Sequence, residues 1–190
     1  MTLVPMFTLL AATLTSGQSD ECSAVPRALL QEPRVPFDET YTNKTWGFAV
    51  SIPRGMTAYS QSSPPYHGVW FVLGDPPHGS IVMSGEANSL EFKTPRAAAL
   101  DQSRMLREEV KQVKSSSIST TRLAGLPAAR VETTYRCKGD PQTYLEVHVL
   151  VIRSRQDPVY DIVLVTTVDH AREDRAVFDR VLRNWQFIGR

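Results

Sequence analysis

The chain has 190 residues, of which 42% are hydrophobic and 22% charged, a composition typical of a globular protein with one domain. Its 21 basic and 20 acidic residues nearly cancel, so the charge gives no indication of a nucleic acid or an anionic membrane as partner. We expect a single domain that acts as a monomer.

The N-terminus has the pattern of a secretory signal peptide. Residues 1–17 carry no charge, and an apolar run from Leu3 to Leu14 is followed by three small residues. This run is shorter than the roughly 20 residues that a membrane-spanning helix needs. No Lys or Arg precedes it, which departs from the usual signal, and a buried N-terminal helix is the alternative. We predict a signal peptide over 1–17 and a secreted or periplasmic mature protein without a membrane span.

Residues 18–40 are polar, contain prolines and show little apolar periodicity, so we expect an extended arm that builds no core. The arm contains Cys22, and the only other cysteine is Cys137. Two acidic residues directly before Cys22 argue against lipid attachment. In an exported protein two lone cysteines usually pair, so we predict a Cys22–Cys137 disulfide. Two unrelated thiols are the alternative.

The domain is expected over residues 41–190. Alternating residues predict a strand at 45–52, and short strands follow at 56–59, 69–73 and 80–85, separated by turns rich in Pro and Gly. Thr94 and Pro95 have the residue types preferred at a helix start, so a helix is predicted from 95 to about 114. Its expected buried stripe has helical spacing and consists of Ala99, Leu106, Val110 and Val113.

The second half predicts two hairpins and a helix. Residues 118–122 and 128–135 form the first hairpin, and the long apolar stretch from Tyr144 to Val168 forms the second. Both faces of the second hairpin are largely apolar, so it should lie in the middle of a sheet that helices cover on each face. A last helix is expected at about 172–183, before a short closing segment at 186–188.

Three stretches resemble the PsbP/DcrB group, whose type member has the photosystem II PsbP-type fold. They are Trp-Gly-Phe-Ala-Val-Ser-Ile-Pro-Arg-Gly-Met at 46–56, Ala-Gly-Leu-Pro-Ala-Ala-Arg at 124–130, and the ending at 177–187. The resemblance covers about residues 41–189, and its motifs mark turns and core rather than chemistry. It implies an α+β fold, with an antiparallel sheet of about six strands flanked by helices as an α/β/α sandwich. It also implies an exported bacterial-type member of a group made mostly of non-catalytic binding or assembly factors.

A few side chains are candidates for ligand contacts. Tyr66 and His67 follow one Pro-Pro pair, and His78 follows another. The two histidine loops lie at opposite ends of the strand at 69–73, which spans about 17 Å, so we expect no shared metal. Glu146 and His148 share a strand face and could form an acid–base pair. The alternative is that they form the wet end of an apolar face.

No nucleophile elbow, His-Glu-x-x-His motif or phosphate-binding glycine loop occurs, so we predict no enzyme and no cofactor. The leading hypothesis is an exported, non-enzymatic module that binds or assembles a protein or an envelope component. One alternative is a carrier of a small, lipid-like ligand held between sheet and helix. Another is a hydrolase that uses His148 or His67.

Overall fold

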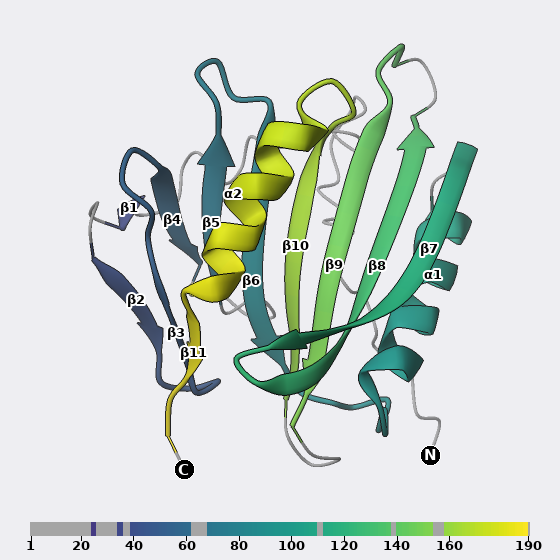
Figure 1. Cartoon of the computed structure of the whole chain (residues 1–190). Coiled ribbons are helices and arrows are strands. Elements are labelled where there is room, and N and C mark those ends of the chain that lie inside the picture. Colours follow the sequence, from purple (N-terminus) through teal and green to yellow (C-terminus); the bar gives the residue numbers. More distant parts are fainter. Residues whose placement is uncertain are drawn as a thin grey trace, which may run out of the picture.

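The computed structural model describes residues 24–25, 34–35, 39–61, 68–109, 112–137, 140–153 and 158–189. The signal peptide predicted over 1–17 lies outside these residues, as do Cys22, Tyr66 and His67. Within the described part, no helix has the length and apolar character needed to cross a membrane. Figure 1 shows a large twisted sheet with one helix on each face and a small second sheet at one side.

Eleven strands and two helices make up the described chain. In order they are β1 (Arg34–Val35), β2 (Thr40–Asn43), β3 (Phe48–Ser51), β4 (Thr57–Gln61), β5 (Gly68–Leu73), β6 (Gly79–Glu86), α1 (Pro95–Glu109), β7 (Gln112–Leu123), β8 (Leu126–Arg136), β9 (Tyr144–Ile152), β10 (Val159–Thr167), α2 (Ala171–Arg183) and β11 (Trp185–Phe187).

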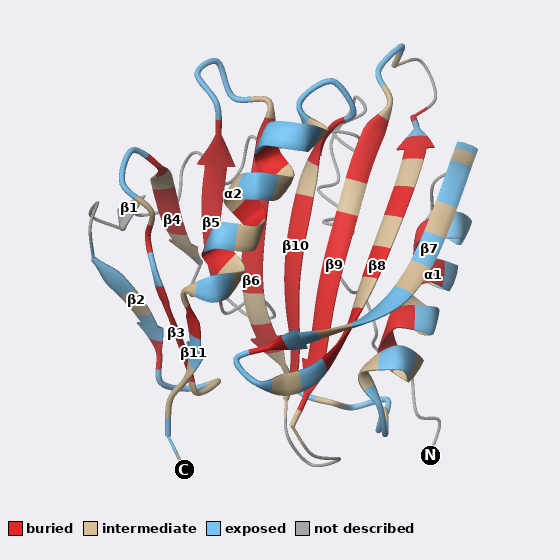
Figure 2. Cartoon of the chain, viewed as in Figure 1, coloured by how far each residue is buried: buried red, intermediate tan, exposed pale blue. Residues whose placement is uncertain are grey.

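The main sheet is antiparallel and has the strand order β1-β4-β5-β6-β10-β9-β8-β7. The hairpin β9–β10 is therefore internal, as predicted, and both strands are buried along almost their whole length (Figure 2). Its valines and isoleucines suit a pleated strand that is covered on both faces. The α+β class and the flanking helices are confirmed, and the main sheet has eight described strands rather than about six.

One face of the main sheet packs against α2 and the small sheet β11-β3-β2. Phe178 and Val181 of α2 are fully buried there, together with Val147 and Val149 of β9. The predicted closing segment is the strand β11, whose Trp185 stacks on Phe48 of β3 with ring centroids 4.4 Å apart. This face holds the largest core cluster of the described chain.

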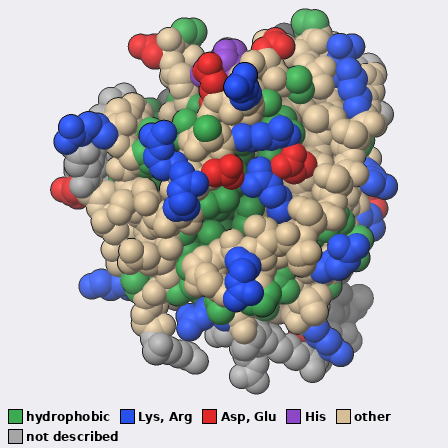
Figure 3. Space-filling view, viewed as in Figure 1, with side chains coloured by type: hydrophobic (Ala, Val, Ile, Leu, Met, Phe, Trp, Pro, Cys, Tyr) green, Lys and Arg blue, Asp and Glu red, His purple; other side chains and the backbone are tan. Residues whose placement is uncertain are grey.

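Ion pairs fasten α2 to β8 above this core. Arg130 of β8 lies 2.8 Å from Glu132 and 3.1 Å from Asp179 of α2, and Arg175 of α2 lies 2.6 Å from Glu132. The guanidinium of Arg130 also sits 5.8 Å from the ring centroid of Phe178. Figure 3 shows basic and acidic side chains gathered over hydrophobic atoms on this side of the molecule.

The opposite face packs against α1, where Ala98 and Ala99 contact Ala129, Val131 and Leu150 of the sheet. Thr94 accepts a hydrogen bond from the backbone N–H of Ala97, as its residue type at the helix start predicted. The helix ends at Glu109 rather than near 114, and β7 begins at Gln112. Val113 therefore lies in a strand, and its predicted place in the helical stripe is wrong.

The N-terminal arm contacts the core at two described positions, Ala24 and Val25, and Val25 packs against the cluster that contains Trp70. Ala24 is 8% exposed and packs with Cys137, Leu106, Tyr135 and Tyr144. Its carbonyl oxygen accepts a hydrogen bond of 2.5 Å from the hydroxyl of Ser80. The expectation that the arm builds no core is thus wrong at these two positions.

Candidate functional site

Glu146 and His148 of β9 meet Asp161 of β10 under helix α1. The hairpin register pairs Val163 with His148 and Asp161 with Leu150, so the three polar side chains lie on the same face of neighbouring strands. Nδ1 of His148 is 3.0 and 3.1 Å from the two carboxylate oxygens of Asp161. Its Nε2 is 2.6 Å from Oε1 of Glu146.

The cluster is buried rather than wet. His148 is 4% exposed and Asp161 is 3% exposed. Burial lowers the pKa of His148, but the carboxylates of Asp161 and Glu146 raise it by more, to about 10. The ring is therefore an imidazolium at neutral pH that donates both of its N–H groups to carboxylates. The interpretation of Glu146 and His148 as the wet end of an apolar face is wrong.

Further polar groups surround this imidazolium. Glu86, at the end of β6, has its pKa raised to about 7 by burial and by the negative charge of Asp161. The amide nitrogen of Gln102 on α1 lies 3.5 Å from Nε2 of His148. Tyr135 has its pKa raised by burial and by Glu146. The α1 side of the sheet thus contains an internal polar layer in which carboxylates outnumber the cation.

The geometry of this arrangement is that of an internal ion cluster. A catalytic histidine needs an accessible ring and a substrate or nucleophile within hydrogen-bond reach. Here both ring nitrogens are occupied by carboxylates, and the ring is sealed beneath α1. Sequence reasoning paired Glu146 with His148 but missed Asp161. The one signal for it was an acidic residue in the middle of an apolar strand.

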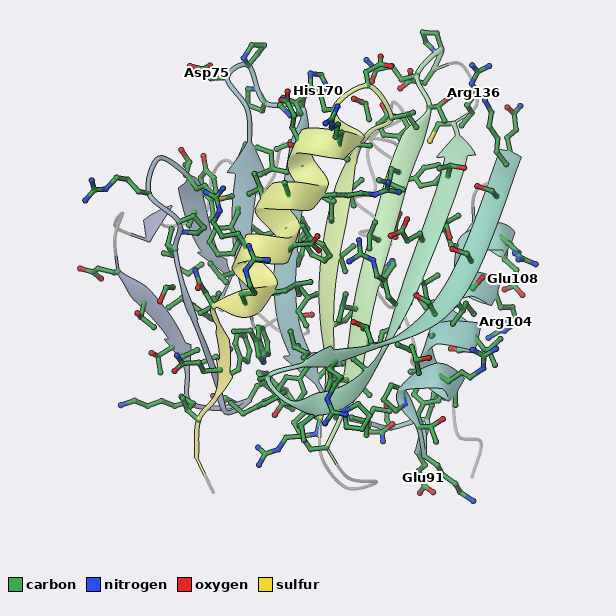
Figure 4. All side chains as sticks on the ribbon, in the orientation of Figure 1. Asp75, Glu91, Arg104, Glu108, Arg136 and His170 are labelled. Carbon is green, nitrogen blue, oxygen red and sulfur yellow. The ribbon has the colours of Figure 1, made fainter. Side chains whose placement is uncertain are left out.

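His78 lies in a different cluster, beside the N-terminus of α2. Its Nε2 is 3.3 Å from a carboxylate oxygen of Asp174, which is buried and also accepts a hydrogen bond from Thr166. The ring of His78 stacks on that of His170, with centroids 3.8 Å apart. Figure 4 places His170 at the same end of the molecule as Asp75, which precedes β6. His78 therefore does not join Glu146 and His148, which lie under α1.

The histidine pair provides no metal centre among the described residues, where no group of three or more His, Cys, Asp or Glu side chains could hold an ion. Tyr66 and His67 are outside those residues, so their proposed ligand contacts and the separation of His67 from His78 stay predictions. The polar contacts of His78 instead join the turn before β6 to the first turn of α2.

The edge of the main sheet formed by β7 is a candidate binding surface. This strand has 12 residues, twice the usual length, and is mostly exposed (Figure 2). It pairs with β8 on one side, and no strand of the described chain pairs with its other side. Residues 115–121 of β7 are serine, threonine and isoleucine, without a charge or a proline that would block a further strand.

The turn of the β7–β8 hairpin shows which backbone groups face the free edge. Ala124 and Gly125 both have positive φ, at 46° and 82°, and form a two-residue turn between Leu123 and Leu126. The residues that flank such a turn bond to each other, and bonded and non-bonded pairs then alternate. This alternation directs the N–H and C=O groups of Ile118 and Thr120 away from β8, to the free edge.

A surface groove of about 540 Å³ follows this edge between β7 and α1. The strand contributes Ser116 and Ile118, and the helix contributes an exposed leucine, a serine, three arginines and a glutamate: Leu100, Ser103, Arg96, Arg104, Arg107 and Glu108. Figure 4 shows Arg104 and Glu108 on the outward side of α1. The groove thus joins an open strand edge to a basic helix face with an apolar centre.

Comparison with known proteins identifies the fold. No protein-family model and no curated protein sequence matches the chain. The solution structure of cyanobacterial PsbP (CyanoP) from Synechocystis sp. PCC 6803 superposes with a TM-score of 0.55 at 14% identity, over 78% of this chain and 91% of that chain. The chain has a PsbP-like fold.

Two further structures were matched at lower TM-scores. A protein of unknown function from Pseudomonas aeruginosa, PA94, matches with a TM-score of 0.43 at 14% identity, over 82% of this chain and 99% of that chain. LpqN, involved in cell envelope biogenesis of Mycobacterium tuberculosis, matches with a TM-score of 0.44 at 11% identity, over 84% of this chain and 87% of that chain. The PsbP-like resemblance inferred from the sequence motifs is confirmed at the level of the fold.

Proposed function

We propose that this PsbP-like chain is an exported, non-enzymatic module that binds another protein. An extended segment of that partner would pair with the edge of β7 as an added strand. The open edge of a 12-residue strand carries this proposal. Backbone N–H and C=O groups at a free edge bind an extended segment of any sequence, and neighbouring side chains then select among segments. The sealed state of His148 supports a role in binding rather than in catalysis.

A lipid-like ligand between sheet and helix has less support. A carrier would hold such a ligand in the layer under α2, and described side chains fill that layer. Phe178 and Val181 are fully buried against valines of β9, which are fully buried as well. The groove beside β7 also lies between sheet and helix, but it is open to solvent. Its three arginines, two serines and one glutamate around Leu100 and Ile118 suit a segment with polar side chains better than a lipid-like ligand.

Export is part of the proposal, and the predicted disulfide belongs to it. Cys137 is 6% exposed, and Ala24 packs in the same cluster. Cys22 precedes Ala24 by two positions in the sequence, so the place of Ala24 is compatible with a bridge from Cys22 to Cys137. A disulfide requires Cα atoms about 4.4–6.8 Å apart. We propose that the bridge holds the arm on the sheet in a secreted or periplasmic protein.

Thiol labelling tests the bridge and its support for export. The protein is purified from its native compartment without reductant, unfolded and treated with a thiol reagent. We expect no labelled thiol, and a mass shift within one chain on reduction. Two labelled thiols per chain would contradict both the bridge and the oxidising location.

Site-specific crosslinking tests the binding edge. A photoreactive residue replaces the exposed Ser117 on β7, and a control carries it at Asp75, in the turn before β6. We expect a discrete adduct to one protein in cells of the source organism from position 117 and none from position 75. Thr120→Pro removes one N–H at the free edge that would bond to an added strand, so it should abolish the adduct. The fold should tolerate this proline, because the N–H of Thr120 faces solvent rather than β8.

Thr120→Val is the matched control for the proline variant, since it changes the side chain and keeps the N–H. It should leave the adduct unchanged, and thermal unfolding should show that both variants fold. An adduct of equal yield in Thr120→Pro and Thr120→Val would refute strand addition at β7.

A further inference from the structure

The groove beside β7 has a charge pattern that selects the segment added to the edge. Arg96, Leu100, Arg104 and Arg107 lie at positions i, i+4, i+8 and i+11 of α1 and form one stripe that lines the groove. Leu100 is 53% exposed, the highest value among the three large apolar side chains that the described surface leaves exposed. Ile118 lies across the groove on β7.

The positive charge of the stripe is only partly neutralised by the protein. Arg104 lies 2.6 Å from Asp101 and 3.0 Å from Glu108. Arg96 and Arg107 make no ion pair with any described side chain, and both are exposed. The guanidinium groups of Arg96 and Arg107, which lie on either side of Leu100 along α1, therefore have N–H donors available for a carboxylate.

The spacing of the stripe fits alternate residues of an extended strand. Four helical residues rise about 6 Å, and two strand residues span about 6.6 Å. A strand added to β7 would direct every second side chain to the α1 side, where Ser116 and Ile118 already point into the groove. An apolar residue of this strand would meet Leu100 and Ile118, and acidic residues two and four positions away would reach the arginines.

We propose that the partner contributes an extended acidic segment in which carboxylates alternate with other residues around one central apolar residue. This inference rests on the proposed strand addition and names the chemistry of the added segment. A second copy of this chain fits poorly as the occupant, because its own β7 presents Ser116, Ile118 and Thr120 and offers no carboxylate to the arginines. The recognition combines backbone pairing with charge complementarity.

The test uses two labelled peptides of equal composition. The in-phase peptide, Thr-Val-Glu-Thr-Leu-Thr-Glu-Val-Glu-Thr, places its three glutamates on the same side as leucine. The out-of-phase peptide exchanges each glutamate with a neighbouring residue, so that the carboxylates face away from leucine in a strand. Binding to the full chain is measured by fluorescence anisotropy at low and at high salt. We expect the in-phase peptide to bind about tenfold more tightly, with the difference reduced by salt.

Charge-reversal variants locate the effect. Arg107→Glu should remove the preference for the in-phase peptide, and Arg172→Glu, an exposed reversal on α2, is the matched control that should keep it. Equal affinity for the two peptides, with binding to both lost in Thr120→Pro, would overturn the proposed charge pattern and leave strand addition standing. A preference that survives in Thr120→Pro would overturn strand addition itself. No binding of either peptide would overturn the inferred segment, and the crosslinking adduct would then decide strand addition separately.

Discussion

Removing the charge of His148 should destabilise the protein strongly at neutral pH. In His148→Gln the side chain can still donate a hydrogen bond, but the carboxylates of Asp161 and Glu146 lose the cation between them. Breaking a buried ion pair by removing one partner typically costs about 3–5 kcal/mol. The pKa gives a similar magnitude. It is raised from 6.5 to about 10, and each pKa unit is worth about 1.4 kcal/mol, which gives roughly 5 kcal/mol as an upper value.

The same shift defines a pH window. Between pH 6.5 and about 10 the folded chain holds a proton on His148 that the unfolded chain has lost. A raised folded-state pKa contributes stability that is complete below pH 6.5 and disappears as the pH rises through 10. Within the window the free energy of unfolding should fall by about 1.4 kcal/mol per pH unit. The loss of unfolding free energy caused by His148→Gln should therefore become smaller as the pH approaches 10.

Urea unfolding followed by circular dichroism at several pH values between 6 and 9.5 measures both effects. The control replaces Glu146, His148 and Asp161 together by leucine, which should recover most of the lost stability, because a buried ion cluster can be exchanged for apolar groups at little cost. If wild type and His148→Gln show the same dependence on pH across this range, the imidazolium between two carboxylates does not exist as described.

Three further variants test the surroundings of the sheet. Glu86→Gln should stabilise the protein above pH 7 by up to about 3 kcal/mol, and hardly at all near pH 4.5, because the raised pKa of about 7 means that ionising Glu86 opposes folding; unfolding at pH 5 and pH 8 measures the difference. Gly68→Ala should cost at least about 1–3 kcal/mol in thermal unfolding, since the added Cβ would lie 2.1 Å from the carbonyl oxygen of Met83. Phe178→Ala should cost about 3–5 kcal/mol by the same assay, because the ring is fully buried under α2, and a value below 1 kcal/mol would contradict the described packing.

Most elements of the fold could be predicted because their patterns are local. The apolar stretch of β9 and β10 and the stripe with Phe178 and Val181 are visible within one element. The end of α1 could not be predicted, because Val110 and Val113 fit helical spacing, while residues 112–117 lack the alternation of a strand. Pairing with β8, which lies later in the chain, decides that this segment is a strand.

The polar cluster and the groove depend on relations that the sequence does not contain. His148 and Asp161 lie on neighbouring strands, and the strand register decides whether they share a face. They do so because Ile152 pairs with Val159, and a shift of one residue would place them on opposite faces. That register depends on the intervening turn. The groove exists because β7 is the edge strand of the sheet and α1 lies beside it. Both facts depend on the order of the strands in the sheet, which no single element of the sequence indicates. Residue types could therefore indicate candidate side chains but could not place Asp161 or Arg107 beside their neighbours.

The pairing of β6 with β10 has a consequence for how the chain folds. It joins β4–β5–β6 to the meander β7–β8–β9–β10, and its paired residues are about 70 to 90 positions apart in the sequence. The meander can form from segments that are neighbours in the sequence. The pairing of β6 with β10 instead requires a large loop to close, and such non-local contacts slow folding. Until then the apolar residues of β6 and β10 stand at open edges, where another chain can pair with them. We expect aggregation during refolding to begin at β6. A mutation that weakens the pairing of β6 with β10 should lower the yield of refolding more than it lowers the stability of the folded protein.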